Sequence, residues 1–276
     1  MGDQVTQVAL QPVDRVEVTV VVDNAIDILA ASNGAARRWP LPSALIGDDI
    51  QHLRAEHGYA LLVTTHRAGA SSSLLYDAGL GRDTLLYNLD VLEAPASDLR
   101  AIVLSHGHAD HHGGLEGIVR RVGRLGLPLV LHPDAWMKRR VVFPSGVELA
   151  MPPPSRSWLE GEGVDIVEER GPTLLLDGTV VVSGQTERVT SFEKGFPLQQ
   201  VAAGDGWEPD PWIWDDQSVS ILVEGKGLVI LSSCSHSGHQ RHEARSTGHR
   251  AAQGPRLHRR FPPHRRAVRT NHSCHR

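Results

Sequence analysis

The chain has 276 residues, of which 40% are hydrophobic and 22% charged, so it can form one large domain or two small ones with a substantial core. This composition excludes a wholly disordered, collagen-like or coiled-coil chain. No apolar run approaches the ~18–20 residues of a membrane span, and residues 1–13 lack the layout of a secretory signal. We therefore expect a cytoplasmic protein with no membrane partner. Cysteines at positions 234 and 274 give no disulfide framework.

Charge is unevenly distributed along the chain. The net charge is −4, but residues 239–276 contain ten arginines, one acidic residue and no lysine, and so carry +9. The remaining residues therefore carry −13. Seven of the 16 histidines also fall in residues 239–276. We therefore predict a folded domain over residues 1–238 and a separate Arg/His-rich tail over residues 239–276.

Strands are predicted where β-branched and apolar residues cluster, and helices where apolar residues recur at helical spacing. The predicted strands cover residues 16–22, 59–65, 73–76, 101–104, 127–131, 164–168, 173–176, 179–183, 218–223 and 228–232. The predicted helices cover residues 83–92 and 113–125, and residues 193–216 are expected to be irregular. Strands with helices between them indicate an α/β fold with two sheets.

The run H-G-H-A-D-H at residues 106–111 directly follows a predicted buried strand. In extended backbone, His106 and His108 project to the same side. Asp110 and His111 follow at a turn that enters a helix. Two adjacent ions could be held here, one by the first two histidines and the other by Asp110 and His111. The alternative is a polar helix N-terminus with solvated histidines, but this density of ligand types favours a metal site.

This run resembles the H-x-H-x-D-H signature of the metallo-β-lactamase superfamily. The resemblance implies an αββα sandwich of two mixed sheets flanked by helices, with a dinuclear metal site at one edge. Residues 73–81 (SLLYDAGLG) resemble the superfamily's strand that ends in an aspartate. Asp77 is therefore expected to orient a ligand histidine, unless it is only a turn residue.

Further stretches narrow the resemblance to one branch of the superfamily. It is the branch named for 7,8-dihydropterin-6-methyl-4-(β-D-ribofuranosyl)-aminobenzene-5'-phosphate synthase. The resemblance covers about residues 16–238, and it is carried by residues 23–24, 56–58, 86–88, 131–134, 186–190, 192–193 and 234–238. It does not imply a substrate.

One expected ligand is missing from its usual place. The superfamily supplies a further histidine from a third motif, but no histidine stands between His132 and His236, and Gln185 occupies the local candidate position. His236, just beyond the last predicted strand, is our candidate for this ligand. Cys234 is a ligand, a wall residue of the site or a buried thiol. We expect two divalent ions, zinc first, with manganese or iron as alternatives.

The resemblance implies a metal-dependent hydrolase that uses a metal-activated water, or a related synthase-type transferase. Asp110 is the candidate catalytic residue, because it would bind the second metal and orient the nucleophile. Arg188 suits a phosphate or carboxylate group and equally suits a plain surface position. The candidate contacts to a small-molecule substrate, phosphorylated or not, are Asn24, His57, His132, Glu187, Arg188 and Cys234.

Three interpretations compete for the tail over residues 239–276. A basic arm that binds nucleic acid accounts for its charge. A metal cluster accounts for its histidines, whose spacing matches no zinc pattern. A frameshifted, disordered translation accounts for the whole composition, since a shifted reading of plausible codons gives Gly-Gly-Phe-His, which resembles the branch's last metal-binding segment. We favour the frameshift, under which the chain is a truncated relative that lacks its final ligand.

Overall fold

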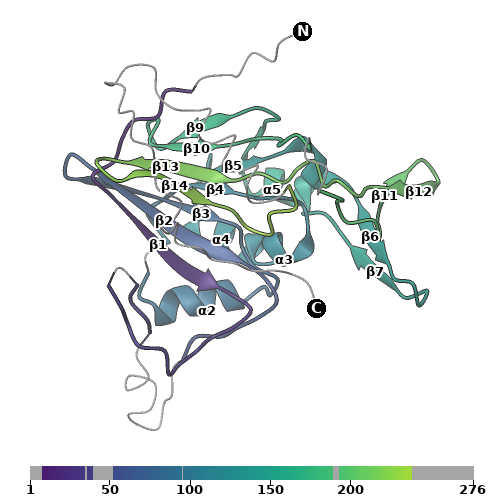
Figure 1. Ribbon diagram of the computed structural model, residues 1–276, viewed down its shortest axis with the longest axis horizontal. Helices are drawn as coiled ribbons and strands as arrows, with labels where there is room; N and C mark the ends of the chain where they lie inside the picture. Colours follow the sequence, from purple (N-terminus) through teal and green to yellow (C-terminus); the bar gives the residue numbers. More distant parts are fainter. Residues whose placement is uncertain (1–7, 35, 40–51, 95, 189–192, 238–276) are drawn as a thin grey trace.

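A computed structural model describes residues 8–34, 36–39, 52–94, 96–188 and 193–237 of the chain (Figure 1). The predictions for the tail over residues 239–276 lie outside this described part. So does the segment 189–192, which overlaps two of the stretches on which the family resemblance rests.

The largest sheet has six strands. Its strands, in spatial order, are β1 (Arg15–Val22), β2 (Ala60–Arg67), β3 (Ala70–Tyr76), β4 (Leu99–Val103), β5 (Pro128–Leu131) and β8 (Asp165–Glu168). The β1–β2–β3 part is antiparallel, and β3, β4, β5 and β8 run parallel. Tyr76 at the end of β3 pairs with Val103 at the end of β4. The residues that follow these two strands therefore emerge side by side at one edge of the sheet.

A second sheet stacks on the first. Its antiparallel strands, in spatial order, are β14 (Gly227–Leu231), β13 (Val219–Val223), β10 (Val180–Val182) and β9 (Thr173–Leu175). Between the sheets lies a core that includes Tyr76 and Val103 from the first sheet and Val180 and Ile221 from the second. Alternating apolar residues on facing strands explain this packing, because each sheet needs a partner for its apolar face.

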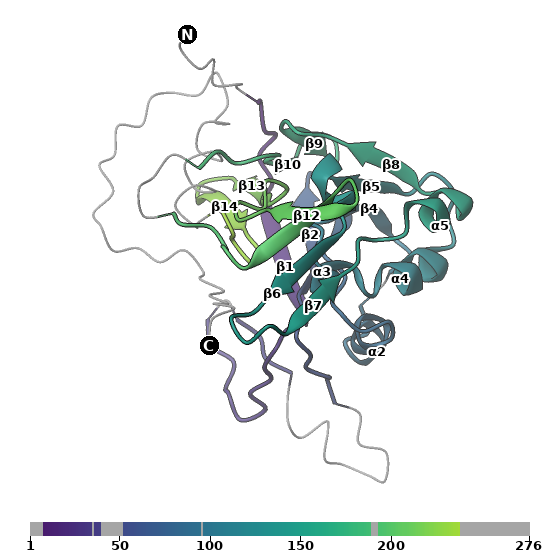
Figure 2. The same cartoon turned by 90° about the vertical axis from the view of Figure 1, so that its right-hand side faces the viewer.

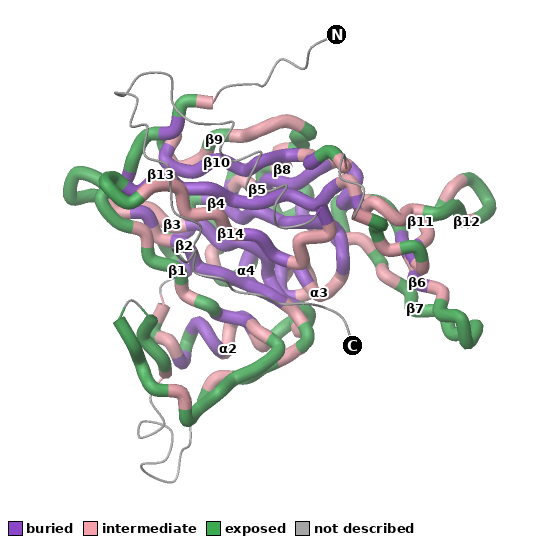
Figure 3. The backbone as a smooth tube through the Cα atoms, in the orientation of Figure 1, coloured by how far each residue is buried: buried purple, intermediate pink, exposed green. Residues whose placement is uncertain are grey.

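Helices cover the other face of the six-stranded sheet. Figure 2 shows α2 (Thr84–Val91), α4 (Leu115–Val122) and α5 (Arg156–Gly161) on that side. Leu85, Ile118 and Leu159 from these helices form a second core with the sheet. Figure 3 shows buried residues in purple along the strands of the stacked sheets and in parts of the helices. Among the described residues, every helix is too short or too polar to span a bilayer.

A third, small sheet projects beside the body (Figure 1). It is antiparallel, in the order β12 (Gly206–Pro209), β11 (Gln199–Ala203), β6 (Arg139–Val142) and β7 (Glu148–Met151). The prediction of an irregular segment over residues 193–216 is wrong where β11 and β12 form. These strands contain only four or five residues, several of them polar or glycine, and β11 pairs with β6 about 60 positions away, so no local pattern marks them.

The predicted fold class, an α/β sandwich of stacked sheets flanked by helices, is confirmed. Two details differ, since the second sheet is antiparallel throughout and the third sheet was not expected. The predicted helix over residues 113–125 is shorter, because α4 spans Leu115–Val122 and ends at Gly123, which has a left-handed backbone. The short helix α3 (Ala109–His112) precedes it and carries part of the H-G-H-A-D-H run.

Candidate metal centre

The candidate site lies at the edge of the sheets where β3, β4 and β14 end. His106 and His108 lie on the loop between β4 and α3, and His236 lies on the loop after β14. The H-G-H loop passes so close to the chain at Ala135 that a Cβ on Gly107 would lie 2.3 Å from the Ala135 carbonyl oxygen. Only glycine fits between the two histidines, which explains why residue 107 is a glycine.

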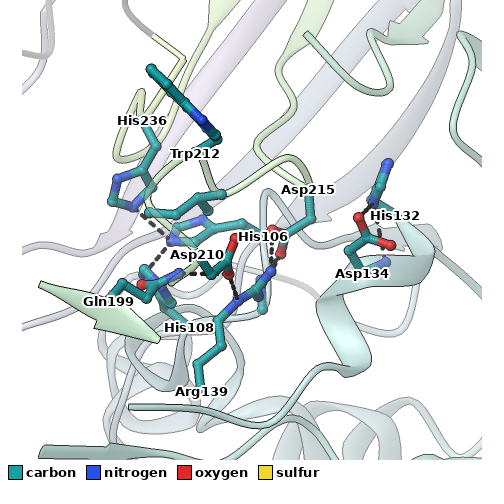
Figure 4. A network of polar contacts seen from close by, with 12 residues as sticks. His106, His108, His132, Asp134, Arg139, Gln199, Asp210, Trp212, Asp215 and His236 are labelled. Carbon is teal, nitrogen blue, oxygen red and sulfur yellow. Dashed lines mark hydrogen bonds and ion pairs between the residues drawn. The ribbon is translucent and has the colours of Figure 1, made fainter. Parts of the chain in front are cut away.

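Three imidazoles converge at the centre of the site (Figure 4). The Nε2 atom of His106 lies 3.0 Å from Nδ1 of His108 and 3.2 Å from Nε2 of His236. The facing atoms of the three rings lie within 4.8 Å of one another. The structure thus brings together the two histidines of the motif and the candidate for the missing third ligand.

The tautomer of His106 follows from its neighbours. The Ser105 hydroxyl donates to Asp77 Oδ2 at 2.7 Å, because a carboxylate only accepts. Ser105 Oγ, 2.8 Å from His106 Nδ1, must then accept a hydrogen bond from that nitrogen. Nε2 of His106 therefore carries the lone pair that faces the cluster, as a metal ligand requires. The hydrogen bonds of His106 therefore leave this residue in the form that binds a cation.

Asp77 also holds His111. Its Oδ2 atom lies 2.8 Å from His111 Nδ1, which directs Nε2 of His111 toward Cys234 Sγ at 3.1 Å and Asp110 Oδ2 at 3.3 Å. Asp77 is fully buried and has a left-handed backbone with φ of 63°, a conformation that Asp tolerates better than most residues. Asp77 thus lies where it can orient a ligand histidine.

Two groups of ligand atoms result, and they share one residue. His106, His108 and His236 form the first, which we call the three-histidine group. His106 with His111 and Cys234 forms the second, and the carboxylate of Asp110 lies beside it. Imidazole, thiolate and carboxylate are the ligand types that zinc accepts. The described residues therefore form a buried cluster of His and Cys side chains suited to a metal site.

Burial and charge set the protonation of these residues in the metal-free protein. Burial lowers the pKa of His106 well below its usual value, lowers that of His236, and lowers that of His108 to about 3, so all three are neutral at pH 7. Burial also lowers the pKa of His111, but Asp110 and Asp77 outweigh it and raise the value to about 10. Burial raises the pKa of Asp110, and His111 more than reverses this.

A small cavity opens beside the second group. Its lining includes Asn24, His57, Asp110 and Cys234. His57 is exposed, with its Nε2 atom 3.4 Å from Asp110 Oδ2. Three of the predicted substrate contacts, Asn24, His57 and Cys234, therefore lie together at the site.

The other three predicted substrate contacts do not line this cavity. His132 is fully buried, with Nδ1 accepting from the backbone of Asp134 and Nε2 3.2 Å from Gln185 Oε1. The Arg188 guanidinium donates to the carbonyl oxygens of Thr186, Trp212 and Ile213. Glu187 is exposed. The structure gives His132 and Arg188 internal partners, which explains why they are not directed into the cavity.

Sequence reasoning missed several residues that hold the ligands. Buried Arg139 on β6 pairs with Asp215 and Asp210, and Asp215 Oδ2 accepts from the Gly107 amide at 2.7 Å. Gln199 at the start of β11 contacts His108. The only local signal is the pair Asp215-Asp216 shortly before the hairpin strand β13, since two adjacent carboxylates at a buried turn require partners.

The fold and the convergent ligands define a class of protein whose metal centre lies at the edge of a β-sandwich. The sequence matches the metallo-beta-lactamase superfamily over residues 53–242, and the chain belongs to this superfamily.

Comparison with individual proteins gives more distant similarities. Over 189 residues the chain is 27% identical to the 7,8-dihydropterin-6-methyl-4-(beta-D-ribofuranosyl)-aminobenzene-5'-phosphate synthase of Methanocaldococcus jannaschii, covering 67% of this chain and 63% of that protein. It is 28% identical over 147 residues to metallo-beta-lactamase domain-containing protein 1 of Xenopus laevis, covering 51% of this chain and 57% of the relative. The chain thus spans less than two thirds of either relative's length.

A solved structure supports the fold. The crystal structure of a metal-dependent hydrolase of the beta-lactamase superfamily superposes with a TM-score of 0.56 at 20% sequence identity. The match covers 81% of this chain and 68% of that structure.

Proposed function

We propose that this protein is a metal-dependent hydrolase that acts on a small molecule, with divalent cations held by the three-histidine group and the neighbouring His111–Cys234 group. The observation that carries the proposal is the convergence of three neutral imidazole nitrogens within 4.8 Å at the sheet edge. Membership in the metallo-beta-lactamase superfamily supports it.

Cations bound at such a centre polarise an electrophile and lower the pKa of water toward neutrality. The chain's own residues supply the rest of the chemistry. Asp110 is directed toward His111 Nε2 and borders the cavity, so it can orient a nucleophile there. His57 reaches the same carboxylate from the exposed side and can contact a substrate there. Asn24 on the cavity wall can hold a polar substrate group.

The proposal is tested by coupling metal analysis to a substrate screen. The purified chain is loaded with zinc, manganese or iron, and its metal content and its hydrolysis of phosphodiesters, lactones and thioesters are measured. We expect bound metal and turnover of one of these classes, both lost in His106→Ala. An unchanged reaction rate in His106→Ala, or no metal retained under any loading condition, would overturn the proposal.

A synthase-type transferase is the second candidate, favoured by the similarity to the dihydropterin synthase. The two activities differ in the acceptor, since a hydrolase transfers the cleaved group to water and the transferase to a second organic substrate. Incubation in ¹⁸O-labelled water separates them by mass spectrometry. Incorporation of ¹⁸O into the product supports hydrolysis, and an unlabelled coupled product supports transfer.

The +9 charge of residues 239–276 carries a different candidate, a nucleic-acid-binding protein. Binding through this segment would fall steeply with salt and disappear when residues 239–276 are deleted. Measuring the affinity for a labelled oligonucleotide at two salt concentrations, for the full chain and the deletion, decides this point. Equal binding by both chains would rule out a role for the tail.

A further inference from the structure

A buried chain of hydrogen bonds leads from the third sheet to His108. His108 Nε2 lies 2.6 Å from Gln199 Oε1, and Gln199 Nε2 donates to Asp210 Oδ2 at 3.0 Å. The same carboxylate oxygen accepts from Arg139 Nε at 2.8 Å. Figure 4 labels these residues and marks their contacts with dashed lines. Apart from His108, none of them was predicted from the motif.

Arg139 fixes which atom donates and which accepts in each of these hydrogen bonds. Arg139 carries five N–H donors and no acceptor, and it is only 1% exposed, so it always donates to Asp210. The Asp210 carboxylate, paired with this guanidinium, only accepts. The side-chain amide of Gln199 must therefore direct its NH₂ group to Asp210 and its oxygen to His108.

The oxygen of Gln199 determines the tautomer of His108. Because this oxygen only accepts, the neutral imidazole must carry its proton on Nε2. The lone pair is then on Nδ1, the atom that lies 3.0 Å from His106 Nε2 inside the three-histidine group. The opposite tautomer would place a proton where a cation has to bind.

We propose that Arg139, Asp210 and Gln199 are positioning residues that hold His108 in its Nε2–H tautomer, so that Nδ1 is free to bind a metal ion. The inference rests on the proposed metal-binding function. It also gives the third sheet a role, because Arg139 on β6 and Gln199 on β11 belong to paired strands of that sheet.

The proposal is tested by removing the acceptor that faces His108. Gln199→Met keeps the length of the side chain and leaves His108 Nε2 without the Gln199 oxygen. The imidazole proton is then free to move to Nδ1, where His106 Nε2 at 3.0 Å accepts it. We expect zinc affinity roughly 10- to 100-fold weaker, the usual effect of losing a partner of a metal ligand.

A second substitution at the same position is expected to restore the tautomer. In Gln199→Glu, a carboxylate oxygen accepts from His108 Nε2 as the amide oxygen does. We expect zinc affinity about tenfold or more stronger than in Gln199→Met, a rescue that loss of packing alone would not give. Asp134→Asn is the matched control, because it breaks the ion pair with Arg170 and touches no member of the chain.

The tautomer is read directly in the metal-free protein by long-range ¹H–¹⁵N correlation NMR of the imidazoles. We expect Nε2–H at His108 in the parent and in Gln199→Glu, and Nδ1–H in Gln199→Met. An Nδ1–H tautomer in the parent would refute the proposal even if every variant failed to fold. So would a Gln199→Glu variant that folds yet binds zinc as weakly as Gln199→Met. Absence of zinc binding by the parent refutes the proposed function instead. The His108 tautomer still tests whether Arg139, Asp210 and Gln199 position this imidazole.

Discussion

Asp215 and Asp216 are consecutive residues whose carboxylates hold two different ligand loops. Asp215 Oδ2 accepts a hydrogen bond from the amide of Gly107, between His106 and His108. Asp216 Oδ2 accepts from both the amide, at 2.7 Å, and the hydroxyl of Ser237, the residue after His236. One short segment therefore sets the spacing between the loop of the H-G-H motif and the loop that supplies the third histidine.

Removal of the Asp216 carboxylate should weaken the three-histidine group. Asp216→Ala leaves the buried amide of Ser237 without this acceptor, which costs about 1–3 kcal/mol of folding free energy. Because the same loop carries His236, we expect zinc affinity to fall by roughly tenfold or more. Isothermal titration with zinc and chemical denaturation of the metal-free protein measure the two effects. Asp216→Asn keeps an acceptor oxygen and should retain most of both, and equal losses in the two variants would contradict this role.

Substitution of His236 should weaken zinc binding strongly, whereas substitution of His132 should leave it almost unchanged. His236→Ala removes one of three convergent nitrogens, so zinc affinity should fall by about 100-fold or more. His132→Ala should leave zinc affinity within about threefold, because both ring nitrogens of His132 face other partners. Competition with a chromogenic chelator measures both constants. A large loss in His132→Ala would place that ring at the metal centre.

The metal-free protein should be most stable near pH 6.5. Burial lowers the pKa of His108 to about 3, so between pH 6.5 and 3 the unfolded chain binds a proton that the folded chain does not. Stability then falls on acidification, by about 1.4 kcal/mol per pH unit for one such group. His111 acts in the opposite direction, because Asp110 and Asp77 outweigh burial and raise its pKa to about 10. Its stabilisation is complete below pH 6.5 and is lost between there and pH 10.

Urea denaturation at pH 5, 6.5 and 9 in the presence of a chelator checks this dependence. The free energy of unfolding should be highest at pH 6.5. His111→Asn should abolish the loss on the alkaline side and keep the loss on the acid side. A free energy of unfolding that is constant across this range would show that the histidines are not held as the structure describes.

Substitution of Cys234 should weaken the binding of only one of the two proposed cations. Its Sγ atom belongs to the group with His106 and His111, and it is absent from the three-histidine group. Cys234→Ser is therefore expected to leave the tighter zinc ion bound with unchanged affinity and to weaken the second by roughly tenfold or more. Stepwise titration followed by elemental analysis resolves the two events. Unchanged binding of both ions would make Cys234 a wall residue of the cavity.

Elements and ligands that are marked by a pattern of neighbouring residues could be predicted from the sequence. The H-G-H-A-D-H run concentrates ligands within six residues, and strands such as β4 and β5 show as short apolar runs. The positions of β11 and β12 could not be predicted, because their pairing depends on a distant strand rather than on their own residues.

The same limit applies to the site. His236 could be proposed as a ligand only because no other histidine was available in the preceding hundred positions. Gln199 and Arg139 have no local signature, since each acquires its role from a partner far along the chain, 91 positions for Gln199 and His108. Conversely, His132 resembles a site residue in sequence, yet a neighbouring amide and Gln185 take both of its nitrogens.

The sharing of His106 between the two ligand groups limits how they can be filled. Ser105 takes its Nδ1 atom, so a single lone pair on Nε2 remains, and one lone pair binds one cation. Occupation of the three-histidine group therefore leaves His111, Cys234 and Asp110 as the protein donors for the second cation. The two positions are unequal from the start. Each would have three protein donors, but the first offers three imidazoles, whereas the second offers a thiol and a carboxylate besides one imidazole and borders the cavity, where an incoming molecule can reach it.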